Sequence, residues 1–122
     1  MMFGLGKKVE IKEKNINEAY REYVKNPNNI MIICVDEQID YDKLHVDGAE
    51  CLPLRLIDQF DEYYPEKDMT YYIYAINIYN SKKACQKLIK KGYKVYQLSS
   101  FLDYRERGAG NEARKKDKRR RK

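Results

Sequence analysis

The sequence predicts an α/β fold with a mostly parallel sheet of about five strands, covered by helices on both faces. Strand-like stretches alternate with stretches of helical periodicity along the chain, which is the order that such folds require. Residues 30–35 are apolar at every position, as is typical of a parallel strand buried on both sides. Residues 70–76 are rich in β-branched and aromatic side chains and are expected to form a second central strand.

The N-terminal elements follow from local patterning. Residues 9–12 alternate apolar and polar side chains, as a short edge strand does. Asn15 or Asn17 can cap the helix that follows, because a short polar side chain accepts hydrogen bonds from the first N–H groups of a helix. Pro27 ends this helix, since it disfavours α geometry at the residue before it. The apolar side chains expected on one face of the helix are Ala19, Tyr20, Tyr23 and Val24.

The middle of the chain continues the alternation. Residues 50–53 are expected to form a short strand closed by a proline, and apolar residues then recur at helical spacing until Pro65. Ligands of open parallel sheets bind beyond the carboxyl ends of the strands. The segment 75–80, which follows the second central strand, is therefore the loop in which we expect a site.

The C-terminal elements complete the predicted domain. Asn80 or Ser81 is expected to cap a helix that ends near Gly92, a plausible residue for the left-handed position after a helix. A strand over residues 93–98 and a last helix over residues 101–107 follow. The predicted organisation is a leader over residues 1–8, a domain over residues 9–107 and a tail over residues 108–122.

The net charge of +6 comes entirely from the end of the chain. Residues 112–122 hold eight basic and two acidic residues, so the rest of the chain holds 25 − 8 = 17 basic and 19 − 2 = 17 acidic residues. The basic pI is thus no sign that the folded body binds nucleic acid. The candidate polyanion-binding residues are Arg114, Lys115, Lys116, Lys118, Arg119, Arg120, Arg121 and Lys122.

Two interpretations of the tail remain open. Its lysines and arginines can neutralise the phosphates of RNA, DNA or an anionic lipid surface without any fold, although it has no aromatic residue to stack on bases. It can equally be a solubilising end, and the sharp clustering of one sign of charge favours contact with a polyanion.

The bulk composition excludes several classes of protein. No apolar run approaches the roughly 18 residues of a membrane span, and the first residues lack the pattern of a signal peptide, so a cytoplasmic location is expected. The three cysteines form no CxxC pair and the chain has one histidine, so we expect no metal site and no cofactor.

Two stretches of the sequence resemble a single-domain rhodanese. Residues 33–54 match the family's Asp-Val-Arg-Glu … Glu-Tyr … Gly-His-Ile-Pro-Gly-Ala … Ile-Pro run with the same spacing, and His45 lies at the family's histidine. Residues 73–98 resemble its strand, active-site loop, helix and final Gly-Tyr … Val-Tyr-x-Leu strand. The resemblance covers about residues 9–107 and implies a rhodanese-like fold.

The departures from the family concern its active site. Active rhodaneses begin a six-residue loop with a cysteine nucleophile, and backbone N–H groups and an arginine surround the sulfur. Here the degenerate loop reads Ala75, Ile76, Asn77, Ile78, Tyr79 and Asn80, so the nucleophile, both arginines and the glycine are replaced. The family's first Asp and Arg become Cys34 and Asp36. The resemblance therefore implies that sulfurtransferase chemistry has been lost at this site.

The expected function is that of a non-catalytic binding or regulatory domain with weak polyanion affinity through its tail. One alternative is a thiol or sulfur-transfer enzyme that uses Cys34 near the usual pocket, although a buried strand cysteine is the favoured interpretation. Another is a nucleic-acid-associated or ribosome-associated factor acting through the tail. His45 is expected to be structural. The apolar side chains of Ile76, Ile78 and Tyr79 either dock an unknown protein partner or fold back into the empty pocket.

Overall fold

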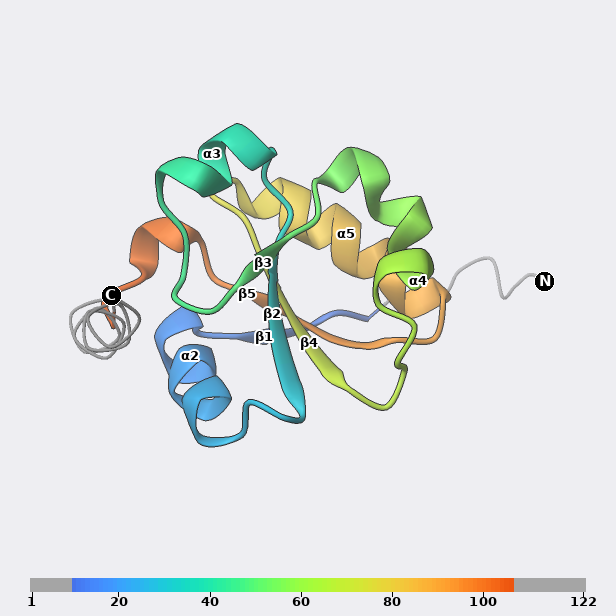
Figure 1. Cartoon of the computed structure of the whole chain (residues 1–122), viewed down its shortest axis with the longest axis horizontal. Coiled ribbons are helices and arrows are strands. Elements are labelled where there is room, and N and C mark those ends of the chain that lie inside the picture. Colours follow the sequence, from blue (N-terminus) through green and yellow to red (C-terminus); the bar gives the residue numbers. More distant parts are fainter. Residues whose placement is uncertain (1–9, 107–122) are drawn as a thin grey trace, which may run out of the picture.

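The computed structural model describes residues 10–106, and these form one parallel sheet with helices on both faces (Figure 1). The predicted leader, tail and outermost domain positions, which are residues 1–9 and 107–122, lie outside the described residues. The strands follow the order β1-β5-β4-β2-β3, and every pair is parallel, as predicted. They are β1 (Lys12–Lys14), β2 (Ile30–Cys34), β3 (Glu50–Cys51), β4 (Thr70–Tyr74) and β5 (Lys94–Leu98).

The helices differ in length and in the face of the sheet that they cover. They are α2 (Ile16–Lys25), α3 (Gln38–Lys43), α4 (Phe60–Tyr63) and α5 (Ile78–Lys90), with the 3₁₀ turns η1 (Leu54–Gln59) and η2 (Phe101–Asp103). One core packs α2 and η2 against one face, and the second packs α5, η1 and α4 against the other. No helix in this described part is long and apolar enough to cross a bilayer.

The two predicted central strands, β2 and β4, lie side by side in the interior of the sheet. Successive side chains of a strand point to opposite faces, so each strand supplies both cores. Ile32 and Tyr72 enter the core beneath α2, whereas Ile33 and Ile73 enter the core beneath α5. This two-sided burial explains why the stretch over residues 30–35 is continuously apolar rather than alternating.

Of the two candidate caps for α2, Asn15 and Asn17, the structure selects Asn15. The side chain of Asn15 accepts hydrogen bonds from the N–H groups of Asn17 at 2.9 Å and Glu18 at 3.3 Å, so Asn15 is the cap. Ala19 is buried as expected, but the predicted inward position of Val24 is wrong, because its side chain is 54% exposed. The helix packs on the sheet mainly through its first turns, and Val24 lies in the last turn, beyond that contact.

Several predicted boundaries are also wrong. The edge strand is β1 rather than residues 9–12, because parallel pairing of Lys12–Lys14 with Tyr96–Leu98 decides its position. Of residues 50–53, only the first two are strand. The helix expected from residue 55 is mostly the 3₁₀ turn η1, which continues into the single turn α4. The helix expected over residues 101–107 is only the short turn η2, capped by the hydroxyl of Ser100.

Two glycines adopt left-handed backbone conformations. Gly92 has φ +94° after α5, which confirms the expected helix ending. Gly48 has φ +84° in the turn before β3, and a Cβ atom there would lie 2.6 Å from the hydroxyl oxygen of Tyr23. The left-handed backbone conformation therefore favours glycine at position 48, and a Cβ there would also force the Tyr23 ring to move.

Candidate functional site

The end of β4 delivers a small, buried residue to the position where the candidate site was expected. Ala75 is completely buried, and the carbonyl oxygen of Ala75 accepts a hydrogen bond from the N–H of Phe101 at 3.2 Å. The chain turns outward at the next residue, and Ile76 is 43% exposed. Ala75 thus belongs to the core, and its methyl group offers no nucleophile.

The loop after Ala75 is shorter than the predicted loop over residues 75–80. The side chain of Asn77 accepts a hydrogen bond from the N–H of Tyr79 at 2.9 Å and caps α5, which begins at Ile78. The prediction that Asn80 or Ser81 is the cap is therefore wrong. Both types of residue suit caps, but Asn77 comes first after the strand and satisfies the first turn. The second half of the predicted loop is helix.

The carboxylate of Asp36 fixes the short loop between β4 and α5. The N–H of Ile76 donates to the two carboxylate oxygens of Asp36 at 3.0 and 3.3 Å. Asp36 follows β2, the strand next to β4, so the parallel order of the sheet places it beside the loop. A loop N–H that could face an external anion is thus satisfied by a negative group of the protein itself, and a second anion nearby would meet charge repulsion.

The predicted candidate thiol lies beneath this carboxylate. The Cys34 side chain is 1% exposed, and its Sγ lies 3.4 Å from Oδ2 of Asp36, to which the thiol donates. Burial, more than any neighbouring charge, raises the pKa of Cys34 to about 12. A reactive cysteine needs a stabilised thiolate, so this environment favours the protonated, unreactive form. Cys85 is buried on the inward face of α5, and its burial also raises the thiol pKa to about 12.

The single histidine, His45, packs against Tyr41 of α3. Nδ1 of His45 lies 2.8 Å from the carbonyl oxygen of Tyr41, and the two rings stack with centroids 4.0 Å apart. The hydroxyl of Tyr41 in turn donates to the carbonyl oxygen of Ala49. His45 therefore ties α3 to the segment that leads into β3, which agrees with the expected structural role.

The apolar side chains at the start of α5 face outward. Ile76, Ile78 and Tyr79 are 43%, 54% and 59% exposed, so the interpretation that they fill an empty pocket is wrong. Ile78 lines two open grooves with volumes of about 520 and 470 Å³. The first groove is lined by Ile11, Glu13, Asn77, Ile78, Tyr79, Lys82 and Gln97. Ile76, Ile78 and Tyr79 thus form an exposed apolar rim at this end of the sheet, next to the two grooves.

Comparisons with known proteins locate this architecture among solved structures. No protein-family model matches the sequence, and no curated protein matches it. A rhodanese-related protein from Thermoplasma volcanium is 13% identical, with a TM-score of 0.60 over 73% of this chain and 84% of its own. The reduced CoADR-RHD of Bacillus anthracis is 20% identical, with a TM-score of 0.65 over 76% of this chain and 16% of its own. The chain has a rhodanese-like fold.

An uncharacterised protein from Saccharomyces cerevisiae shares the rhodanese-like fold at 16% identity. Its TM-score is 0.69 over 84% of this chain and 98% of its own length. At these identities the likeness concerns the fold, and the chemistry of the site depends on the residues of this chain. In this rhodanese-like domain the position that follows β4 holds Ala75, and Asp36 faces the loop where the family pattern has arginine.

The sequence did not single out Asp36 as part of the site. From the sequence, Asp36 is only a departure from the family's arginine in the first stretch of the resemblance. The hydrogen bond to Ile76 becomes visible only when β2 and β4 are paired. A signal was present, because a reversal of charge at a position next to an active-site loop changes which ligands the loop can accept.

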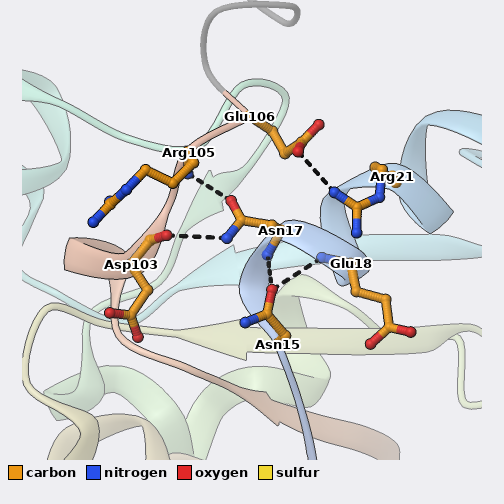
Figure 2. A network of polar contacts seen from close by, with 7 residues as sticks. All are labelled: Asn15, Asn17, Glu18, Arg21, Asp103, Arg105 and Glu106. Atoms are coloured by element: carbon orange, nitrogen blue, oxygen red, sulfur yellow. Dashed lines mark hydrogen bonds and ion pairs between the residues drawn. The ribbon is translucent and has the colours of Figure 1, made fainter.

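The end of the described rhodanese-like domain is fastened to the start of α2 (Figure 2). The side-chain amide of Asn17 donates to the carbonyl oxygen of Asp103 and accepts from the N–H of Arg105. Arg21 forms an ion pair with Glu106, with 2.7 Å between Nη1 and Oε2. Arg105 and Glu106, the last residues that the structure describes, therefore lie against α2.

Proposed function

We propose that this chain is a non-catalytic rhodanese-like binding or regulatory domain, whose basic tail adds weak affinity for polyanions. The observation that carries the proposal is the pair of Ala75 and Asp36 at the candidate site. Ala75 supplies no thiol, and the Asp36 carboxylate occupies the N–H of Ile76 at 3.0 Å. A sulfane-sulfur donor such as thiosulfate is an anion, and it would find neither a nucleophile nor a free positive cradle.

The exposed rim supports binding as the remaining role. Large apolar side chains that stay exposed beside grooves are typical of surfaces that contact other proteins, and tyrosine is among the residues that contribute most at such surfaces. Ile78 and Tyr79 have this arrangement, and the ring of Tyr79 carries the ammonium group of Lys83 5.2 Å from its centroid. The alternative of a thiol enzyme acting through Cys34 has less support, because that thiol is buried and its pKa is raised.

The first experiment tests for sulfur transfer. The full chain is incubated with thiosulfate and cyanide, and thiocyanate is measured against an active rhodanese as the positive control. We expect no thiocyanate above the background without protein. The Ala75→Cys variant is also expected to be inactive, because position 75 is fully buried and the loop N–H remains bonded to Asp36. Robust turnover by the unmodified chain would overturn the proposal.

The second experiment tests the tail. A fluorescein-labelled double-stranded oligonucleotide is titrated with the full chain and with a chain that ends at Glu106, over a range of salt concentrations. With eight basic residues in the tail, the slope of log affinity against log salt concentration is expected to be no steeper than about −7. The truncated chain should bind much more weakly. Equal binding by the two chains would remove the tail from the proposal.

A further inference from the structure

Two cysteines of the described domain lie directly opposite each other on neighbouring strands. Cys34 at the end of β2 pairs in register with Cys51 of β3, and the N–H of Leu52 donates to the carbonyl oxygen of Cys34 at 2.9 Å. Adjacent strands are ~4.7–4.9 Å apart, which falls inside the ~4.4–6.8 Å range of Cα separations that a disulfide can bridge. Both thiols are free in this structure.

The two side chains point to the same face of the sheet. Cys34 lies in the core beneath α2, whereas Leu52, the neighbour of Cys51, lies in the opposite core. Because side chains alternate along a strand, Cys51 shares the face of Cys34. Both sulfur atoms also contact one residue: Cys34 Sγ lies 3.4 Å from the Asp36 carboxylate, and Cys51 Sγ lies 3.4 Å from the Asp36 carbonyl oxygen.

We propose that Cys34 and Cys51 are an oxidisable pair that forms an intramolecular disulfide when the protein meets a peroxide. Cys51 is half-buried and Cys34 is 1% exposed, so the oxidant reaches Cys51 first. This site is independent of the proposed function, because neither thiol has to transfer sulfur to a substrate.

The reaction balances with hydrogen peroxide as the only co-reactant. The thiolate of Cys51 attacks one peroxide oxygen, an S–O bond forms, the O–O bond breaks, and the departing hydroxide takes a proton to become water. The sulfur of Cys34 then displaces the hydroxyl group of the Cys51 sulfenic acid, the S–S bond forms, and a second water leaves. The Asp36 carboxylate, 3.4 Å from Cys34 Sγ, is placed to receive the thiol proton on its way to that water. Two thiols lose two electrons, and the peroxide is reduced to two waters.

The surroundings make this pair slow to react at neutral pH. Burial and the nearby carboxylates of Asp36, Asp42 and Glu37 raise the pKa of Cys51 to about 11, and the hydroxyl of Tyr64 also lies close to it. Cys34 faces Asp36 and the hydroxyl of Tyr74. Below pH 11, each increase of one pH unit is therefore expected to raise the oxidation rate about tenfold, since only the thiolate attacks.

Formation of the disulfide reaches the candidate site through Asp36. The Cys34 thiol donates to the same carboxylate that accepts the N–H of Ile76. Oxidation removes the S–H donor and joins the end of β2 to the edge strand β3. Oxidation of the cysteine pair thus changes the hydrogen bonding of the carboxylate that binds Ile76, the first residue of the exposed apolar rim.

The test uses the intact chain, with Cys85 as an internal control. Cys85 is as buried as Cys34, but it lies on α5 rather than on a strand that pairs with β2 or β3. The chain is treated with hydrogen peroxide at several pH values, alkylated after unfolding, and analysed by mass spectrometry without reduction. We expect a mass loss of two hydrogen atoms, a linked Cys34–Cys51 peptide, and an alkylated Cys85. The Cys51→Ser variant should show no such loss.

A second arm removes the effect of slow kinetics. The chain is unfolded, refolded in a glutathione redox buffer and mapped in the same way, so that the fold rather than the reaction rate selects the partners. Preference for Cys34–Cys51 over either pairing with Cys85 supports the proposal. Statistical pairing, disulfides between chains, or oxidation of Cys51 to sulfinic acid with Cys34 still free would overturn it.

Discussion

Tyr74, the last residue of β4, joins the sheet to the turn before β3 through one buried hydrogen bond. The N–H of Val46 donates to the hydroxyl oxygen of Tyr74 at 3.0 Å, and the two residues are 0% and 1% exposed. The Tyr74→Phe substitution removes only this hydroxyl group and keeps the ring that stacks on Phe101. The N–H of Val46 then remains buried without its partner, and water does not reach it.

The expected cost is at least that of leaving the N–H of Val46 without a partner, because the Tyr74 hydroxyl also contacts the Cys34 thiol. An unsatisfied buried donor destabilises a protein by about 1–3 kcal/mol, and the ring leaves no large cavity to add to this figure. For a domain of this size each kcal/mol lowers Tm by about 4–8 °C. We therefore expect Tyr74→Phe to lower the free energy of unfolding by at least about 1 kcal/mol and Tm by at least about 4 °C.

Urea unfolding followed by far-UV circular dichroism measures the change, since the chain has no tryptophan for fluorescence. The matched control is Tyr63→Phe, because Tyr63 is 54% exposed and loses the same atom to water. The control should change the free energy of unfolding by less than about 0.5 kcal/mol. If both variants unfold at the same urea concentration with the same slope, the hydrogen bond between Val46 and Tyr74 does not stabilise the fold as argued.

Three further predictions concern the site, a turn and an exposed carboxylate. Asp36→Asn removes a negative charge beside Cys51, so the pKa of that thiol should fall and its alkylation by iodoacetamide at a fixed pH should accelerate; an unchanged rate would contradict the charge argument. Gly48→Ala should destabilise the fold by about 1 kcal/mol or more in urea unfolding, because a Cβ would meet a tyrosine hydroxyl at 2.6 Å in a left-handed turn; no loss would mean that α2 moves freely. The pKa of Glu22 is lowered from 4.5, chiefly by the hydrogen bond from Tyr72, so its stabilising effect is present above the unfolded pKa and is lost as pH falls through the folded one. Glu22→Gln should therefore flatten the loss of Tm as the pH falls below 4.5, and parallel curves would count against this linkage.

The interior of the sheet was predictable because its residues have one simple requirement. Strands buried on both faces need apolar side chains at every position, so the stretch over residues 30–35 could be recognised without knowledge of its neighbours. The left-handed Gly92 after α5 was predictable for a similar reason, since few other residues adopt that conformation at low cost. These features depend on local chemistry.

The start of α5 was not predictable, because three polar residues competed for one role. Asn77, Asn80 and Ser81 all suit a helix cap, and the end of β4 decides among them. With the strand ending at Tyr74 rather than at residue 76, Asn77 is the first cap that the chain reaches. The side chain of Ser81 is then buried, and its hydroxyl donates to the carbonyl oxygen of Ile78 instead.

The short edge strands and the Asp36 bond share a different origin. Parallel pairing between segments far apart in the chain decides both, as in the three-residue β1, which pairs with β5 more than 80 residues later. A sequence read in order carries no direct record of such partners. Placing Asp36 beside Ile76 required the register of β2 on β4, which brings together residues 40 positions apart.

The bonds from Arg105 and Glu106 to α2 determine where a force applied beyond residue 106 first acts on the domain. A tail attached to a large polyanion would pull on Glu106 and Arg105, and the first bonds under tension would be those to Arg21 and Asn17 (Figure 2). The pull would reach α2 through these bonds, and it would also reach the loop before α5, because Ser100 and Phe101 donate hydrogen bonds to the carbonyl oxygens of Ile76 and Ala75. The domain would therefore be held through residues 105 and 106, and the exposed apolar rim would remain accessible to a partner.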